Sequence, residues 1–154
     1  MNKVVLITGC SSGIGRDLSQ RLSLAGYTVI ATARNSGSLT HLDAAEKLSL
    51  DVTRSGSITQ AVEAILEKFG RIDVLVNNAG YAQVGAIEDL TDDQVHQLYE
   101  VNVFGVLRMV RAVLPVMRKQ GSGQIINISS IAGKLVTPVN GVYASSKFAL
   151  EALS

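Results

Sequence analysis

The segment that decides the fold is residues 8–15, Thr8-Gly9-Cys10-Ser11-Ser12-Gly13-Ile14-Gly15, which follows the apolar run Val4-Val5-Leu6-Ile7 and leads into a helical pattern. A strand that ends at a glycine-rich turn and continues as a helix points several backbone N–H groups, and the positive end of the helix dipole, at one place. The three glycines have the spacing G-x-x-x-G-x-G. Gly9 allows the chain to turn tightly out of the strand, Gly13 allows the backbone to approach a pyrophosphate, and Gly15 allows the helix to lie close to the sheet. The segment predicts a pyrophosphate-binding loop, and the alternative is an ordinary tight strand-to-helix turn.

The composition indicates one buried-sheet domain. The chain has 154 residues, which we treat as a single domain over residues 1–154, with 18% charged residues and a mean hydropathy of +0.27. A net charge of +1 provides neither a basic field for nucleic acid nor a polybasic strip for a membrane surface. No apolar run approaches the roughly 18 residues that a membrane helix needs. We therefore expect a cytoplasmic protein without nucleic-acid or membrane partners.

The single cysteine, Cys10, cannot form an intrachain disulfide, which suits a reducing compartment. Its place in the glycine loop, near a helix N-terminus, raises the alternative of a reactive thiol. We favour a small space-filling side chain, because free cysteine usually packs as a small hydrophobe.

Strand and helix patterns alternate along the chain, which predicts an α/β, Rossmann-type, doubly wound parallel sheet with helices on both faces. We expect strands at 4–7, 27–33, 45–50, 72–76 and 124–128, and helices at 14–25, 57–69, 91–119 and 140–154. In the first helix, Ile14, Leu18, Leu22 and Ala25 form the apolar side.

The helix expected at 91–119 is unusually long and carries more apolar residues than one core-facing stripe needs. Asn102 lies among apolar neighbours, where a polar side chain needs a partner or a task, and Pro115 should kink the far end. The apolar excess predicts that a second face of this helix packs against another subunit.

Two positions near strand ends bear on the cofactor. In dinucleotide folds an acidic residue after the second strand binds the ribose 2′-hydroxyl, whereas an arginine accommodates a 2′-phosphate. Here that place is occupied by Arg34, which favours NADP(H) over NAD(H), and the alternative is a solvated loop arginine. Asp51 follows the third strand and could accept a hydrogen bond from an adenine amino group or cap the next helix.

Tyr143 and Lys147 are four residues apart in the last helical pattern, so they lie on one helix face. A phenol is a poor base at neutral pH, and a fixed cation nearby favours the phenolate. By itself, such a pair usually lies on the protein surface without a functional role. Ser130, at the end of a strand, could hold a substrate oxygen at the same sheet edge, and the three residues together suggest acid–base chemistry.

These motifs, in this order and spacing, resemble the short-chain dehydrogenase/reductase family over nearly the whole chain. The resemblance is carried by the glycine loop, Asn77-Asn78-Ala79-Gly80, Asn102, Ser130 and Tyr143-x-x-x-Lys147. It implies NAD(P)-dependent oxidation of an alcohol or reduction of a carbonyl, with no metal.

The resemblance also implies roles for four catalytic residues. Tyr143 would donate or remove the proton, and Ser130 would polarise the substrate oxygen. Lys147 would hold the nicotinamide ribose hydroxyls and favour the phenolate. Asn102 would break its helix locally and hold a water in a proton relay to the lysine. Ser129 is the less favoured alternative to Ser130.

By the same resemblance, Asp51 and Val52 would meet the adenine, and Asn78, Ala79 and Gly80 would line the adenosine ribose. The implied cofactor-binding residues are Thr8, Gly9, Ser11, Ser12, Gly13, Ile14, Gly15, Arg34, Asp51, Val52, Asn78, Ala79, Gly80, Tyr143 and Lys147.

Members of the family normally continue past the tyrosine helix, so the fold is expected to be incomplete at its C-terminus and to expose an unpaired edge at the fifth strand. We therefore expect this chain alone to aggregate or to depend on a partner. The family's helices at 91–119 and 140–154 imply a homodimer or homotetramer.

The substrate pocket has two walls within this sequence, at 81–90 and 134–140. They are partly apolar and suggest an apolar substrate of the steroid, retinol or ketone kind. The alternative function is a catalytically silent nucleotide-binding or oligomerisation module.

Overall fold

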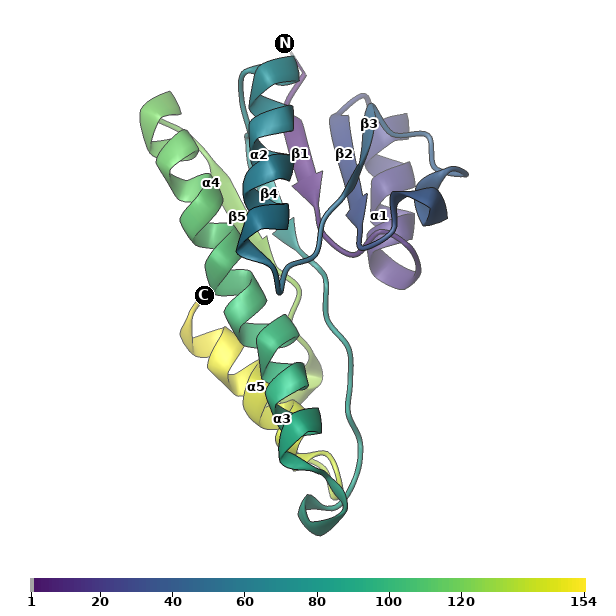
Figure 1. Ribbon diagram of the computed structural model, residues 1–154, viewed down its shortest axis with the longest axis vertical. Helices are drawn as coiled ribbons and strands as arrows, with labels where there is room; N and C mark the ends of the chain where they lie inside the picture. The colour runs from purple at the N-terminus through teal and green to yellow at the C-terminus, as the bar shows by residue number, and fades with distance from the viewer. Residues whose placement is uncertain (1) are drawn as a thin grey trace.

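The computed structural model describes residues 2–154 and contains a five-stranded, fully parallel sheet in the order β3-β2-β1-β4-β5 (Figure 1). The strands are β1 (Val4–Ile7), β2 (Thr28–Ala33), β3 (Glu46–Ser49), β4 (Val74–Asn77) and β5 (Gln124–Asn127). The α-helices are α1 (Gly13–Leu24), α2 (Ser55–Phe69), α3 (Asp92–Tyr99), α4 (Val106–Gln120) and α5 (Gly141–Ala152). The expected α/β, doubly wound, Rossmann-type architecture is therefore confirmed.

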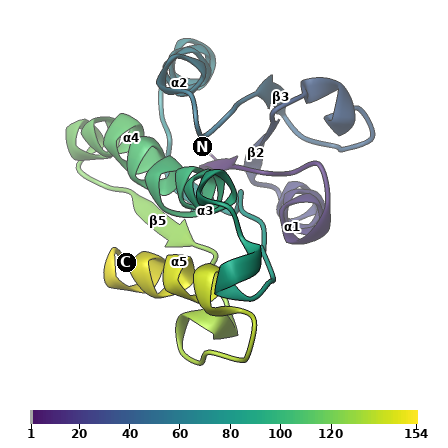
Figure 2. The ribbon, with the colours of Figure 1, turned by 60° about the horizontal axis from the view of Figure 1, so that its bottom comes forward.

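Helices lie on both sides of the sheet: α2 and α4 cover one side and α1 the other, while α5 lies at the β5 end, where it packs against α3 (Figure 2). The first layer shares a core in which Leu6 and Leu75 of the sheet pack with Ile65 of α2 and Met109 of α4. Alternate strand residues point the other way, so Val5 and Val76 belong to a second cluster, against which Leu18 and Leu22 of α1 pack. Both faces of the central strands are thus buried, which explains their continuous apolar runs.

The element boundaries lie within two residues of the sequence-based expectations, apart from a break in the long helical run. Two differences have a clear physical cause. β4 begins at Val74 rather than at Ile72, because the Ile72 backbone is bonded elsewhere. Its N–H donates to Gln120 Oε1 and its C=O accepts from Gln120 Nε2, both at 2.9 Å. The expectation that Ile14 and Ala25 face the core is wrong, since both are exposed, Ile14 at 63%. They occupy the ends of α1, beyond the strands that its middle covers.

The long helical run is not one continuous α-helix. Residues Glu100–Gly105 form a π-helical segment, η3, between α3 and α4. A π segment of this kind often marks a functional site. Pro115 lies inside α4, which continues to Gln120. The local break implied at Asn102 is confirmed.

The predicted sheet edge is also confirmed, because within residues 2–154 β5 pairs only with β4, and it alternates between exposed and half-buried residues. Between α1 and β5 lies an open apolar groove of about 340 Å³, lined in part by Leu18, Val76 and Ile126. Within residues 2–154, no helix is long and apolar enough to cross a membrane.

Candidate functional site

The glycine loop has the geometry that its spacing predicts. Gly9 adopts a positive φ of 73°, and a Cβ added there would lie 2.9 Å from Ala79 Cα. A Cβ on Gly15 would lie 2.3 Å from Asn78 Nδ2 and 2.5 Å from the Gly9 carbonyl oxygen. Only glycine fits at these two positions, so the start of α1 lies directly against the ends of β1 and β4.

The outer part of this loop is open. Gly13 has a φ of 55°, and a Cβ added there would have no atom within 4 Å. Residues 11–14 are all exposed, and Ser12 occupies the N-cap position without capping α1 through its side chain. Backbone N–H groups at a helix N-terminus are thereby presented to solvent, which is the arrangement that binds a phosphate group.

Hydrogen bonds from residues about seventy positions away hold the loop in place. The Thr8 hydroxyl accepts from the backbone N–H groups of Asn78 and Ala79, both at 3.0 Å. In return, Asn78 Nδ2 donates to the carbonyl oxygens of Thr8 at 2.8 Å and Gly9 at 3.0 Å. Thr8 is only 1% exposed, so its side chain serves this connection, which we call the Thr8–Asn78 latch. The sequence analysis missed the latch, because nothing in one chain marks residues so far apart as partners.

Cys10 is fully buried, and its thiol lies 3.4 Å from the Ile7 carbonyl oxygen. Burial raises the pKa of this thiol to about 11, against a smaller lowering by a backbone hydrogen bond involving Thr32. The group is therefore a protonated, inaccessible thiol at neutral pH, as the space-filling interpretation predicts.

Two charged residues, Arg34 and Asp51, lie just after the ends of β2 and β3. Arg34 is exposed and Asp51 is half-buried. Burial raises the Asp51 pKa, but hydrogen bonds from Thr53 and the charges of Arg34 and Arg54 outweigh it and lower the pKa overall. Asp51 is not the cap of α2, whose N-cap is Arg54; its Oδ1 accepts instead from the N–H and hydroxyl of Thr53.

Val52 is 7% exposed, and its side chain is used in packing. A Cβ on Gly105 would lie 2.8 Å from Val52 Cγ2, which shows how closely the π-helical segment approaches this residue. Any contact of Val52 with a ligand would therefore be made through its backbone.

Asn102 connects three segments. Its Oδ1 accepts from the Tyr81 N–H at 3.1 Å, and its Nδ2 donates to the Tyr81 carbonyl at 2.9 Å. Nδ2 also lies 3.2 Å from the hydroxyl oxygen of Ser146 in α5, which itself donates to the Tyr143 carbonyl. The amide is 1% exposed and thus ties the loop after β4 to the helix that carries Tyr143 and Lys147. Ser146 was not singled out from the sequence.

Lys147 is buried, with 7% of its surface exposed, and its ammonium donates to the Ile128 carbonyl at 2.9 Å. The same Nζ lies 5.9 Å from the centre of the Tyr143 ring. Burial lowers the Lys147 pKa. A cation below a phenol ring, at the end of β5, is the arrangement that the i, i+4 spacing predicts.

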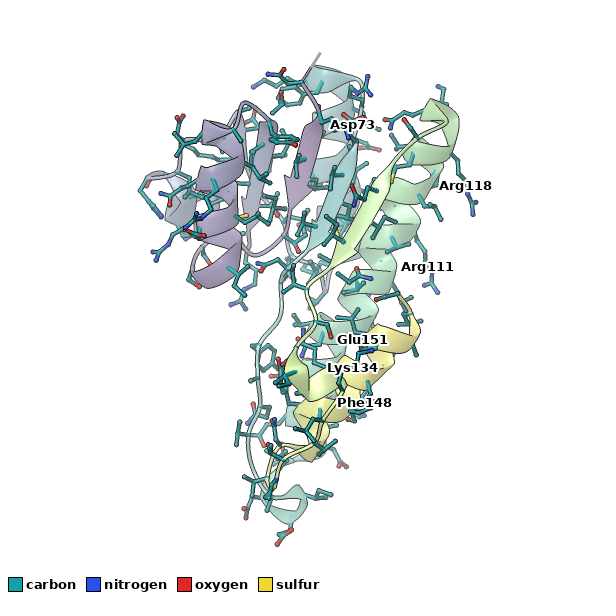
Figure 3. All side chains as sticks on the ribbon, turned by 180° about the vertical axis from the view of Figure 1, so that it is seen from behind. Asp73, Arg111, Arg118, Lys134, Phe148 and Glu151 are labelled. Atoms are coloured by element: carbon teal, nitrogen blue, oxygen red, sulfur yellow. The ribbon has the colours of Figure 1, made fainter. Side chains whose placement is uncertain are left out.

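Ser130 follows β5 and begins the short helix η4 (Ile131–Gly133), where its Oγ accepts from the Ala132 N–H at 3.1 Å. Its hydroxyl proton remains available for donation. Ser129 lies beside Gly133, where an added Cβ would come within 2.9 Å of both Ser129 Oγ and Glu151 Cγ. In Figure 3, Lys134 and Glu151 lie together on this side of α5, joined by a 2.6 Å ion pair.

The candidate residues thus gather at the carboxyl edge of one parallel sheet. The glycine loop follows β1, Asn78 and Gly80 follow β4, and Ile128 and Ser130 follow β5, with Lys147 reaching Ile128 from α5. A Cβ on Gly80 would lie 3.1 Å from Asn102 Oδ1 and 3.8 Å from Lys147 Nζ. The residues that follow β4 therefore meet Asn102 and Lys147 at Gly80. In open parallel sheets this edge is where ligands bind. Among residues 2–154, no group of acidic, histidine or cysteine side chains is arranged to hold a metal ion.

Comparison with known proteins agrees with this geometry. The family model described as "short chain dehydrogenase" matches residues 3–154. A 3-ketodihydrosphingosine reductase of Bacteroides thetaiotaomicron is 46% identical over 152 residues, which are 99% of this chain and 56% of that protein.

Solved structures give the same result. A short-chain dehydrogenase from Streptomyces avermitilis superposes with a TM-score of 0.95 at 46% identity, over 100% of this chain and 58% of that one. A gluconate 5-dehydrogenase from Burkholderia cenocepacia, in complex with NADP and tartrate, has a TM-score of 0.92 at 32% identity, over 99% of this chain and 64% of that one.

The chain belongs to the short-chain dehydrogenase family. It spans somewhat more than half the length of the relatives that it matches here.

Proposed function

We propose that the protein is a nicotinamide-dependent oxidoreductase that interconverts an alcohol and a carbonyl compound. The observation that carries this proposal is the buried Lys147 ammonium, held at the Ile128 carbonyl beneath the Tyr143 ring, at the sheet edge that also carries the glycine loop. A buried cation has a desolvation cost that a purely structural helix avoids. Family membership supports the same reaction class.

The glycine loop fits the pyrophosphate of such a cofactor. Open space at Gly13, exposed backbone at 11–14 and the free N-terminus of α1 together form a cradle for an anion. We propose direct roles here for Gly9, Ser11, Ser12, Gly13, Ile14 and Gly15, with Thr8 and Asn78 acting through the latch and Ala79 and Gly80 approaching the ribose. Bound NADPH supplies a hydride, and NADP⁺ accepts one.

In the reductive direction the carbonyl carbon gains hydride and the carbonyl oxygen gains a proton. We propose that Tyr143 donates this proton while the Ser130 hydroxyl donates a hydrogen bond to the same oxygen. Lys147 favours the phenolate that Tyr143 leaves behind and binds the nicotinamide ribose. The reverse reaction returns the proton to Tyr143.

Asn102 has a specific part in this scheme. Its side-chain amide is committed to Tyr81 and Ser146. A relay water would therefore be held by backbone carbonyls of the π-helical segment, whose hydrogen bonding is looser than that of an α-helix.

We propose NADP(H) as the preferred cofactor. Arg34 is exposed at the end of β2, with its charge acting on Asp51, and a guanidinium there suits a 2′-phosphate. The Asp51 carboxylate and Val52 backbone would meet the adenine. The NADP-bound structure of the 32% identical dehydrogenase supports nicotinamide cofactor use in general.

An apolar substrate fits the two loops near Tyr143, which expose Val84, Leu135, Val136 and Val139. The 46% identical relative is a 3-ketodihydrosphingosine reductase, and a keto compound is consistent with this substrate class.

We further propose a cytoplasmic protein that forms a homodimer or homotetramer through the helices of 91–119 and 140–154, where Phe104 and Phe148 are each 44% exposed. Light scattering of the wild-type protein and of Phe148→Ser tests this assembly.

The experiment that tests the function is titration with NADPH and NADH, followed by nucleotide fluorescence, in the wild-type and Arg34→Asp proteins. We expect preferential NADPH binding that the variant reverses, and ketone reduction that Tyr143→Phe abolishes while NADPH still binds, with the loss of at most the one contact of the Tyr143 hydroxyl. Binding without turnover would instead select the silent nucleotide-binding module.

A further inference from the structure

Three residues of α5, Tyr143, Lys147 and Glu151, follow one another at intervals of four and therefore lie on one face of the helix. The first two belong to the proposed reaction, and Glu151 has no part in it. The Glu151 side chain is 28% exposed, and its carboxylate pairs with Lys134 Nζ at 2.6 Å (Figure 3). A carboxylate thus lies one helical turn from the buried ammonium without a task in the chemistry.

The part of α5 that carries Glu151 packs against η4. An added Cβ at Gly133, the last residue of η4, would lie 2.9 Å from Glu151 Cγ. It would also lie 3.2 Å from the Lys147 carbonyl oxygen. No side chain fits at Gly133, so η4 approaches α5 as closely as its backbone allows.

The Ser129 hydroxyl lies at the same contact, since its Oγ would be 2.9 Å from the added Cβ on Gly133. This Oγ is buried, and no group of residues 2–154 pairs with it at ordinary hydrogen-bond geometry. A buried hydroxyl needs an acceptor, and the group beside it is the Glu151 carboxylate. Hydrogen bonding with Lys134, and to a smaller extent with the nearby Ser129 hydroxyl, lowers the pKa of Glu151. Because Lys134 is 72% exposed, its ion pair is weak, and Ser129 is the partner that can fix the carboxylate.

The position of Ser130 depends on this contact. Ser130 follows Ser129 directly and begins η4, where its Oγ accepts from the Ala132 N–H. The helix η4 has only three residues, and so short a helix is not stable by itself. Its place relative to Tyr143 is therefore set by the side chains that join it to α5.

We propose that Glu151 is a positioning residue: its carboxylate accepts a hydrogen bond from Ser129 Oγ, fixes η4 against α5, and so holds the Ser130 hydroxyl in line with Tyr143. The inference rests on the proposed function. Glu151 itself touches neither substrate nor cofactor in this role. Ser129 then acts beside Ser130 rather than in place of it.

The first test measures NADPH-dependent ketone reduction and NADPH binding in the same proteins. We expect Glu151→Leu and Ser129→Ala each to lower kcat by about tenfold, while the Kd for NADPH stays within about twofold. Glu151→Gln keeps an oxygen acceptor for Ser129 and should retain most of the kcat. Glu63→Leu, at an exposed position of α2, is the matched control and should change neither quantity. An unchanged kcat in Glu151→Leu, with an active wild-type protein, would overturn the inference alone.

The second test separates positioning from a general loosening of α5. Because Glu151 is proposed to act through Ser130, Glu151→Leu should lower the remaining kcat of a Ser130→Ala protein by less than about twofold. A tenfold loss in both backgrounds would mean that Glu151 supports α5 as a whole, and would overturn the inference. If the wild-type protein binds no NADPH and reduces no ketone, the proposed function falls, and the role of Glu151 falls with it.

Discussion

The two halves of the candidate site are held in different ways. In the cofactor half, the glycine loop is built from neutral groups that satisfy one another: Thr8 and Asn78 exchange hydrogen bonds, and Gly9 and Gly15 fit without space for a Cβ. The catalytic half contains the buried ammonium of Lys147 and the strained backbone of Val139, a β-branched residue with a φ of 54°. A binding loop can therefore be made from interactions that also stabilise the fold, whereas reactive groups carry a stability cost.

The largest effect on the cofactor half is expected from Gly15→Ala. Its methyl group would lie 2.3 Å from Asn78 Nδ2 and 2.5 Å from the Gly9 carbonyl oxygen, neither of which is a freely moving group. We expect a loss of about 3 kcal/mol in unfolding free energy, measured in urea, together with loss of NADPH binding. Gly56→Ala, where a Cβ would meet nothing within 4 Å in α2, is the control and should be neutral or slightly stabilising.

Thr8→Val tests the latch with nearly constant side-chain volume. The Ala79 N–H would lose its acceptor and the Asn78 N–H would keep only the Val76 carbonyl at 3.1 Å, so we expect a cost of about 1–2 kcal/mol in unfolding free energy. Thr8→Ser should recover most of it. Thr32→Val removes only one donated bond, to the Ile7 carbonyl, and should cost less. A Thr8→Val protein as stable as wild type would show that the latch contributes nothing.

Lys147→Met should have the opposite sign. Removing the buried ammonium from the nucleotide-free protein should raise the unfolding free energy by on the order of 1 kcal/mol while abolishing turnover. Burial lowers the Lys147 pKa in the folded state, so the unfolded chain binds more protons between that pKa and 10.5. The wild-type protein therefore regains stability as the pH rises through this window.

Denaturant unfolding of both proteins at a series of pH values tests that sign. The advantage of Lys147→Met should be largest and constant below the folded-state pKa, and should disappear above 10.5. An advantage independent of pH across this range would mean that packing, rather than charge, explains the difference.

The smallest effect is expected at the Lys134–Glu151 ion pair, which joins η4 to α5 with side chains 72% and 28% exposed (Figure 3). The hydrogen bond from Lys134 lowers the Glu151 pKa, so any stabilisation is present above the ordinary carboxyl pKa and is lost as the pH falls. Lys134→Met should change Tm by less than about 2 °C, as should Arg21→Met in the exposed Asp17–Arg21 pair. A larger shift at Lys134 alone would mean that this pair holds the catalytic half in place.

The sequence predicted what depends on local pattern. Alternating strands and helices, the glycines of the loop and the Tyr143–Lys147 spacing all follow from short-range rules, and each appears in the structure. The burial of Cys10 was predicted from the general tendency of free cysteine to pack as a small hydrophobe, and the structure confirms it.

What escaped prediction depends on contacts between distant segments. The Thr8–Asn78 latch, the Gln120 side chain that takes the Ile72 backbone out of β4, and the Gly85–Val139 bond each join residues 48 to 70 positions apart. The exposure of Ile14 was missed because helical periodicity does not say where the sheet beneath a helix ends.

The latch also has a consequence for the order of folding. Its hydrogen bonds span 70 and 71 residues, so the glycine loop is completed only after β4 has docked beside β1. Closing so long a loop is slow, and parallel sheets of this kind have a high contact order. The amides of Asn78 and Ala79 should therefore exchange with deuterium only through cooperative opening of the sheet, and a cofactor could not act as a template for the early folding steps.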